Sequence, residues 1–307
     1  MRSPARRSLP ALAVMVTAII AFGGCSSTAD AAPAATTGGT HAVAHARGIT
    51  EVPDDPQRVV VLEPVELDTA VALGVTPVGA AVASNVAGVP AYLGVDGVAP
   101  VGTVPEPDLE AIAALRPDLI LGTESRHSKL YDQLSSIAPT VFMTTQSDPW
   151  QQNAMLVGEA LGKTAPTTAL LAEFTQRCSS IKDEFALDGK TANMIRPRDE
   201  TTLSLYGPTS FAGSALECVG FTIPAQNWKD GLQADISPEN IRNAAADYLF
   251  VTAADVDDRS LIPAAITQNA DAFGSVTLVD TSYWVSGVGP KGGMRVLDDV
   301  ERFLSTR

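Results

Sequence analysis

Histidine is scarce in this sequence, with three residues in a chain of 307. His41 and His45 lie in the N-terminal segment, and His127 stands alone further along the chain. A site for bare zinc or manganese needs three or four converging histidine and carboxylate ligands. The scarcity argues against such a site and against a Ser/His/Asp triad. The sequence also lacks the GxSxG, HExxH and P-loop motifs of common enzyme classes.

Basic residues are also few. The chain has 21 Lys and Arg against 35 Asp and Glu, which gives a net charge of −14. This balance argues against nucleic acid or an anionic membrane surface as a partner of the folded body. The contents of 45% hydrophobic and 18% charged residues are typical of a globular protein. A chain of this length is expected to bury a large core in one or two domains.

The N-terminus has a basic start, with Arg2, Arg6 and Arg7, followed by an apolar run over residues 9–22. The run is too short to span a membrane comfortably, and the pattern is typical of a secretory signal. It ends in the letters FGGC at Cys25, which resemble a bacterial lipobox. In a lipobox the cysteine is lipidated and becomes the new N-terminus.

Residues 1–24 are therefore predicted to be a lipoprotein signal peptide. Residues 25–48 are predicted to form a lipidated flexible tether, because Ala, Thr, Gly and Ser dominate the stretch after Cys25. The mature protein is expected to be exported and held by acyl chains at the outer face of the bacterial cytoplasmic membrane. Contact with the membrane is expected through the lipid anchor only.

Two further cysteines, Cys178 and Cys218, remain in the mature chain. In an oxidising compartment they can pair as a disulfide. Each can equally be a small buried hydrophobic residue on a helix. The sequence does not decide between these alternatives.

The stretch Asp108–Gly122 recurs in altered form at Ser237–Val251, with a constant offset of 129. Each copy predicts an N-cap, a short helix, and an Asp followed by a buried parallel strand. Each also places a glutamate in the first helical turn, Glu110 and Glu239, where a carboxylate stabilises the helix dipole. A repeat of this spacing is too long for a solenoid and favours two similar α/β lobes.

The remaining pattern alternates between strands and helices on either side of a helical segment. We expect an N-terminal α/β lobe over residues 49–147 and a C-terminal α/β lobe over residues 187–307. Residues 148–186 are expected to be a helical connector, in which the second helix continues to about Phe185. The alternation implies parallel pairing and right-handed crossovers.

Residues from about 45 to 304 resemble the iron-siderophore substrate-binding lipoproteins of ABC importers, which are class III, helical-backbone periplasmic binding proteins. The resemblance rests on stretches such as LDTAVALGVTPVGA, VGTVPEPDLEAIAALRPDLILG, LYDQLSSIAPTV and SLYGPTSFAGSALECVGF. It implies two Rossmann-like lobes with central, mostly parallel sheets joined by one long α-helix. It also implies capture of a ferric siderophore between the lobes and its delivery to a permease.

The same resemblance implies a role for the repeated glutamates. In this family one exposed glutamate of each lobe docks onto basic residues of the permease dimer, and by motif these are Glu110 and Glu239. The alternative for each is helix stabilisation alone. The resemblance implies a binding protein that is monomeric and is not an enzyme. Because the histidines are too few for a bare-metal site, iron is expected to arrive as a chelate, with no resident cofactor or metal.

The ligand is expected between the lobes, beside the carboxyl ends of the strands. Ferric complexes of catecholates or carboxylates are anionic, and arginine recognises planar oxygen pairs well. Aromatic side chains offer flat faces to the periphery of a chelate, although core packing is the alternative for each. The candidate ligand-binding residues lie in loops that are expected to follow the strands. They are Arg196, Arg198, Arg126, Lys291, Tyr206, Trp284, Glu66 and Ser84.

Three other functions stay open. The protein could bind heme or cobalamin with the same fold, with Tyr206 or His127 as an axial ligand. An envelope enzyme could use the carboxylates of Glu63 and Glu66 for acid/base work. A role in envelope assembly without transport is the third.

Overall fold

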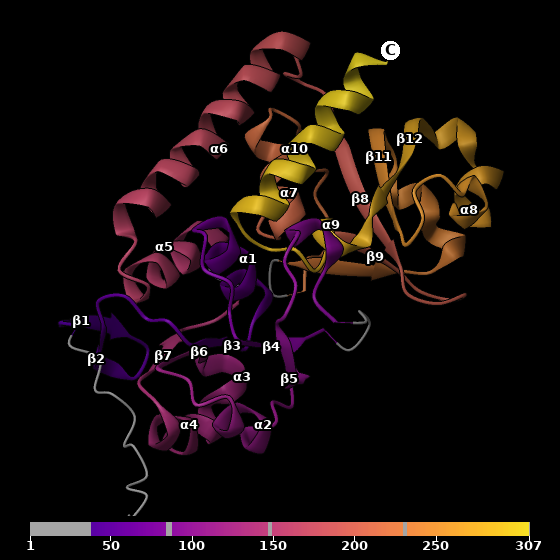
Figure 1. Ribbon diagram of the computed structural model, residues 1–307. Helices are drawn as coiled ribbons and strands as arrows, with labels where there is room; N and C mark the ends of the chain where they lie inside the picture. The colour runs from indigo at the N-terminus through magenta and orange to yellow at the C-terminus, as the bar shows by residue number, and fades with distance from the viewer. Residues whose placement is uncertain (1–37, 84–87, 147–148, 230–231, 307) are drawn as a thin grey trace, which may run out of the picture. The chain divides into compact units, whose positions relative to one another are not determined.

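The computed structural model describes residues 38–306 except residues 84–87, 147–148 and 230–231. The predicted signal peptide, Cys25 and Ser84 lie outside the described residues. The first of two five-stranded sheets has the order β5-β4-β3-β6-β7, and its neighbouring strands are all parallel (Figure 1). Its strands are β3 (Val59–Val61), β4 (Gly79–Val82), β5 (Ala99–Thr103), β6 (Leu119–Thr123) and β7 (Thr140–Met143).

The second sheet has the order β10-β9-β8-β11-β12, which repeats the order of the first. Strand β9 is antiparallel to both of its neighbours, and the pairs formed by β11 with β8 and β12 are parallel. The strands are β8 (Ala192–Pro197), β9 (Leu203–Tyr206), β10 (Gln233–Ile236), β11 (Ala246–Ala253) and β12 (Phe273–Asp280). The predicted α/β class with two mostly parallel sheets is confirmed, while the predicted domain boundaries stay a prediction.

The two copies of the sequence repeat occupy equivalent places in the two sheets. The helix α2 (Leu109–Ala114) precedes β6, and the side chain of Asp108 caps it by accepting the N–H groups of Glu110 and Ala111 at 3.0 Å each. The second copy does not form the predicted α-helix. It is a 3₁₀ helix, η3 (Pro238–Ala244), with a kink at Asn240.

The repeated aspartate has the same function in both lobes. The carboxylate of Asp118 accepts the backbone N–H groups of Gln57 and Arg58, which directly precede β3. The carboxylate of Asp247 accepts the N–H and hydroxyl of Thr191, which directly precedes β8. Each aspartate therefore joins the start of its own strand to the start of the central strand beside it.

Two helices connect the sheets, α5 (Trp150–Ala160) and α6 (Thr164–Phe185). Helix α6 has 22 residues, which corresponds to about 33 Å. A disulfide between Cys178 and Cys218 joins α6 to α7 (Phe211–Cys218). The structure thereby decides between the alternatives that the sequence left open for these cysteines.

The C-terminal helix α10 (Pro290–Ser305) packs against α6 and α7, and also against α1 (Pro64–Ala72) of the N-terminal lobe. The buried carboxylate of Asp68 on α1 accepts the N–H groups of Lys291 and Gly292 at 2.8 Å each. It therefore occupies the N-terminus of α10, where backbone donors lack intrahelical partners. Gly289 has a φ of 146°, and a Cβ there would lie 2.5 Å from this carboxylate.

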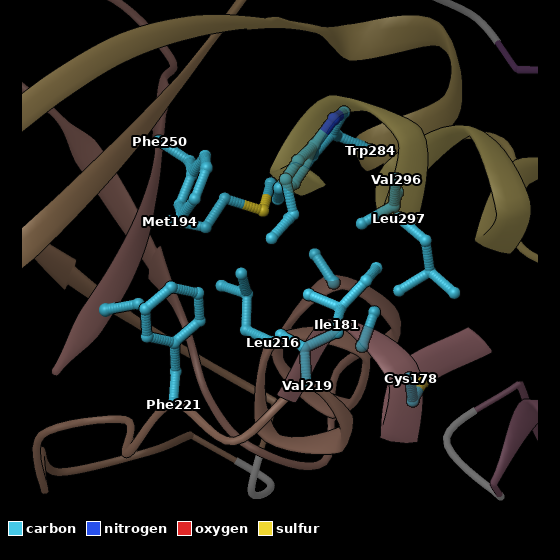
Figure 2. Close-up of a cluster of buried hydrophobic side chains, with 14 of the residues drawn as sticks. Cys178, Ile181, Met194, Leu216, Val219, Phe221, Phe250, Trp284, Val296 and Leu297 are labelled. Atoms are coloured by element: carbon cyan, nitrogen blue, oxygen red, sulfur yellow. The ribbon is translucent and has the colours of Figure 1, made fainter. Parts of the chain in front are cut away.

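Hydrophobic side chains cover both faces of each sheet, as expected for parallel strands. On β11, Phe250 belongs to a cluster with α6, α7 and α10, while its neighbours Leu249 and Val251 belong to a cluster on the opposite face. Figure 2 shows the first of these clusters, in which Phe250 and Trp284 lie together with side chains of all three helices. The lobes are thus built on cores of their own.

The predicted tether over residues 25–48 is wrong at its C-terminal end. The strands β1 (Thr40–His45) and β2 (Gly48–Pro53) form an antiparallel hairpin. Val43 and Val52 are fully buried in the core of the N-terminal lobe. His41 contacts the carboxylate of Asp54 at 3.1 Å.

The other elements are short. They are the 3₁₀ helices η1 (Ala91–Leu93), η2 (Ser128–Leu130), η4 (Arg259–Leu261) and η5 (Ala270–Ala272), and the α-helices α3 (Glu124–His127), α4 (Tyr131–Ile137), α8 (Ala264–Gln268) and α9 (Thr281–Trp284). Within the described ranges, every helix is too short or too polar to cross a membrane.

Candidate functional site

A cavity of about 480 Å³ lies between the two lobes and the start of the connector. It opens beside the carboxyl ends of β3 and β6, where the strand order of the first sheet reverses direction. Such a switch point is the usual place for a ligand in a sheet of this kind. The described residues that line it come from segments 63–65, 149–153, 206–214, 232–233 and 284–288, together with Arg126 and Gln146.

An ion pair between Glu63 and Arg126 lies on the N-terminal side of the cavity. Glu63 follows β3 and Arg126 follows β6, so the adjacency of these two strands brings the side chains together. The Nη1 atom of Arg126 lies 3.1 Å from one carboxylate oxygen of Glu63, and the hydroxyl of Thr123 donates to the other at 2.9 Å. Burial raises the pKa of Glu63 to about 7, although Arg126 and Thr123 act to lower it.

The neighbouring candidate Glu66 is buried in α1, three residues after Glu63. Its side chain is buried and accepts the N–H groups of Leu62 and Glu63 at 2.9 and 3.0 Å. Burial and the nearby Glu63 hold the pKa of Glu66 well above its ordinary value. Glu66 is not among the lining residues, so the structure does not present Glu63 and Glu66 to the cavity as an acid/base pair.

Aromatic side chains form much of the opposite wall. Tyr206, Trp150 and Phe211 all line the cavity, and the rings of Trp150 and Phe211 meet edge to face at 5.6 Å. The indole N–H of Trp150 is buried and has no hydrogen-bond partner among the described residues. In the sequence, Trp150 falls within the expected helical connector, residues 148–186. Its position at the boundary between lobe and connector is the signal that could have identified it.

The candidate Arg196 lies behind this wall. It is the fifth residue of β8, it is partly buried, and its Nη1 lies 3.5 Å from the hydroxyl of Tyr206. Arg196 is therefore one side chain removed from the cavity, because Tyr206 lines it and Arg196 does not. Among the described lining residues, Glu63 and Arg126 are the charged ones.

Trp284 lines the cavity but is mainly a core residue. It is 1% exposed and stacks on Phe250 with ring centroids 5.0 Å apart. Its indole N–H donates to Asp299 at 2.9 Å. The close-up in Figure 2 places it among the packed hydrophobic side chains of the second lobe. The core-packing alternative thus describes Trp284 better than a free flat face does.

Two other cationic candidates lie away from this cavity. Arg198 is exposed beside a separate hollow that Leu203 and Pro238 also line. Lys291 is at the start of α10, where its backbone N–H contacts Asp68. The structure therefore brings Arg126, Tyr206 and Trp284 to the cavity wall, and leaves Arg198 and Lys291 elsewhere.

The structure contradicts His127 as an axial ligand. The side chain is fully buried, and its Nδ1 accepts the N–H of Thr123 at 3.1 Å. Nε2 is therefore the protonated nitrogen and donates to the carbonyl of Val104 at 2.7 Å. Burial lowers the pKa of His127. Both ring nitrogens are engaged, so neither is free for a heme iron.

The repeated glutamates are both exposed, Glu110 in the first turn of α2 and Glu239 in the first turn of η3. A hydrogen bond from the side chain of Ser237 lowers the pKa of Glu239. Equivalent positions in the two lobes thus present a carboxylate to solvent.

Comparisons with known proteins agree with this architecture. A family model described as "Periplasmic binding protein" matches residues 59–279. YfiY of Bacillus subtilis, described as a probable siderophore-binding lipoprotein, is 31% identical over 327 residues, covering 98% of this chain and 100% of that protein. The Fe(3+)-citrate-binding protein YfmC of the same organism is 27% identical and covers 98% of both chains.

The crystal structure of Staphylococcus aureus SirA complexed with staphyloferrin B is similar, with a TM-score of 0.71 and 28% identity. The match covers 87% of this chain and 99% of that one. The similarity spans both lobes and the connector and supports the predicted two-lobed fold.

Proposed function

Because this chain belongs to the periplasmic binding protein family, we propose that it captures a ferric siderophore between its two lobes and delivers it to an ABC importer. The relatives named above are described as binding siderophores or ferric citrate. The observation that carries the proposal is the cavity at the switch point of the first sheet, with Arg126 in its wall. Its volume of about 480 Å³ is in the usual range for small-molecule sites.

The charge and shape of the cavity favour an anionic, partly aromatic ligand. Arg126 is 37% exposed and keeps guanidinium donors available beyond the one that contacts Glu63. Tyr206, Trp150 and Phe211 provide flat surfaces opposite to it. Arg196 adds positive charge behind Tyr206. These features suit a carboxylate or catecholate chelate of Fe³⁺, so iron arrives already chelated and needs no resident cofactor.

Delivery is assigned to the exposed glutamates of the repeat. Glu110 and Glu239 lie at equivalent positions of the two lobes and would contact basic residues of the permease dimer. Exposed charges of this kind increase the association rate and fix the orientation of a partner more than they increase affinity. The binding protein itself acts as a monomer and performs no catalysis.

The location follows from the N-terminal sequence. Cys25 is the proposed lipidation site, which would hold the mature protein at the outer face of the cytoplasmic membrane. Mass spectrometry of the membrane-extracted protein should find a diacylglyceryl group on an N-terminal Cys25. An unmodified N-terminus at another residue would contradict the anchor but would leave ligand capture untouched.

A tryptophan-fluorescence titration tests ligand capture. Trp150 lines the cavity, so a ligand there is expected to quench its emission. The panel contains ferric hydroxamate, catecholate and carboxylate chelates beside their iron-free counterparts, and also heme and cobalamin. Submicromolar quenching by one ferric class supports the proposal. Quenching by heme or cobalamin alone favours that cargo, and no quenching by any member contradicts transport.

A further inference from the structure

The ion pair at the cavity wall is unequally exposed to solvent. The carboxylate of Glu63 is 2% exposed, whereas the side chain of Arg126 is 37% exposed. Glu63 has few contacts besides Arg126 that stabilise its charge. The hydroxyl of Thr123 donates one hydrogen bond to it, and the backbone N–H of Glu66 donates another in a capping box at the start of α1. Arg126 is thus the one cation in the described cavity lining that stabilises the negative charge of Glu63.

No other charge faces Glu63 from the described lining of the cavity. Across the cavity, α5 and α7 present neutral side chains, among them Trp150, Asn153 and Ser210. Glu63 is the N-cap of α1, and the other carboxyl group beside it is that of the buried Glu66, whose pKa is raised by burial and by the charge of Glu63. A negative group placed at Arg126 therefore acts on Glu63 without compensation.

On the basis of this geometry, and of the function proposed above, we propose that Glu63 is the proton acceptor of the ligand site. When an anionic chelate binds at Arg126, the guanidinium is shared with the ligand and a second negative charge lies beside Glu63. Both changes favour the neutral carboxylic acid. Glu63 then takes one proton from solvent, which remains on the carboxyl group as long as the ligand is bound. No covalent bond to the ligand forms and no electron moves.

Proton uptake gives the site a preference that Arg126 alone would not give. An anionic chelate binds to the guanidinium of Arg126, and the proton taken up by Glu63 balances the negative charge that the chelate brings to the site. A neutral chelate causes no uptake, because it leaves Arg126 with Glu63. Burial places the pKa of the free Glu63 at about 7, so the exchange takes place in the physiological range. Affinity for an anionic chelate is therefore expected to fall as the pH rises through this value.

Calorimetry tests the coupling with the mature lipoprotein in detergent micelles. Ferric citrate is the anionic probe, and a neutral ferric trihydroxamate is the control ligand. Titrations in two buffers of different ionisation enthalpy give the number of protons taken up. If binding raises the pKa of Glu63 by about one unit, uptake at pH 7.5 is about half a proton. The dissociation constant then rises about threefold from pH 7 to pH 8.

Two variants separate Glu63 from other titrating groups. Glu63→Gln is expected to bind ferric citrate with no uptake beyond that of the ligand itself and with the threefold rise lost. Glu106→Gln, which changes an exposed carboxylate of the same lobe outside the cavity lining, is expected to behave as wild type. Equal uptake by wild type and Glu63→Gln would overturn the inference and leave the proposed function standing. The same holds if only the neutral chelate binds.

If no ferric chelate binds, the proposed function is contradicted. The coupling between Arg126 and the proton of Glu63 can still be tested by a measurement without ligand. Infrared spectra recorded across a pH titration follow the carboxylic-acid band that Glu63→Gln removes. In Arg126→Gln the midpoint of this band is expected to rise by about one pH unit, because a neighbouring cation lowers a carboxyl pKa by about that much or more. An unchanged midpoint would show that Arg126 does not control the proton of Glu63, and would refute the inference.

Discussion

Replacing Glu63 with glutamine should make the protein more stable at neutral and alkaline pH. In the folded protein the pKa of Glu63 is raised from its ordinary value of 4.5 to about 7, chiefly by burial. Between these two pH values the folded state holds a proton that the unfolded state has lost. Stability therefore falls as the pH rises through this window. The difference corresponds to about 3 kcal/mol at 1.36 kcal/mol per pH unit.

Glutamine resembles the protonated carboxyl group and does not titrate, so Glu63→Gln is free of this penalty. The free energy of unfolding of the variant should increase relative to wild type by about 2.5 kcal/mol between pH 5 and pH 8. Urea unfolding at several pH values in this range measures it. The penalty is consistent with the common cost of functional sites, where a residue serves binding at the expense of stability.

The difference between variant and wild type removes the contributions of all other titrating groups. Glu110→Gln is the matched control, because it changes an exposed carboxylate of the same lobe. The same urea unfolding series on this variant shows the effect of removing a carboxylate that is exposed to solvent. If the free energy of unfolding of Glu63→Gln differs from that of wild type by the same amount at each pH, ionisation of the buried Glu63 does not destabilise the folded protein, and the reasoning is refuted.

Three further predictions concern other parts of the molecule. Replacing Cys178 and Cys218 with serine should lower the free energy of unfolding by about 4 kcal/mol, because the disulfide closes a loop of 40 residues and restricts the unfolded chain. Urea unfolding measures this loss, and a value below about 1 kcal/mol would contradict the stabilising role of the disulfide. Glu110→Ala combined with Glu239→Ala should abolish iron uptake by cells but leave ligand affinity unchanged, and a loss of affinity would refute the docking role. Arg196→Ala should weaken binding of an anionic chelate by less than about 1.5 kcal/mol, the lower end for a direct charge-assisted hydrogen bond, because Tyr206 separates Arg196 from the cavity. A larger loss in calorimetry would contradict this placement.

The topology of the two sheets could be predicted because the repeat includes the aspartate that joins neighbouring strands in each lobe. Asp118 and Asp247 recur at the offset of the repeat, and each accepts the N–H of the residue that precedes the central strand. Sequence periodicity identified the strand that follows each aspartate. The helical half was predicted less well, since Pro238 at the first position and the kink at Asn240 produce a 3₁₀ helix. Local composition hardly distinguishes these two kinds of short helix.

The cavity wall could be predicted only in part, because its key contact joins residues 63 positions apart. Arg126 was identified by its charge, but its partner Glu63 depends on the adjacency of β3 and β6. The sequence was also misleading for two tryptophans of similar context. Both line the cavity and both belong to the buried core of the second lobe, but the indole N–H of Trp284 donates to Asp299, whereas that of Trp150 has no partner among the described residues. Their difference results from tertiary packing and leaves no local pattern.

The N-terminal hairpin shows a different limit. Residues of low complexity before position 48 predicted a tether, yet β1 pairs with β2 along its whole length. The pairing buries Val43 and Val52 against the first lobe. Two isolated valines give no periodic signal, so only the completed lobe shows that they are core residues.

Retention of radioactive iron by the purified protein shows whether the interlobe cavity binds a ferric siderophore. The mature lipoprotein is incubated with ⁵⁵Fe-loaded chelates of each class and separated from free ligand by gel filtration. Iron from one chelate class is expected to elute with the wild-type protein in a one-to-one ratio. Arg126→Ala is expected to retain much less iron, while Glu110→Ala retains as much as wild type. If no chelate class delivers iron to the protein fraction, or if Arg126→Ala retains it fully, the interlobe cavity is not the site of a ferric siderophore.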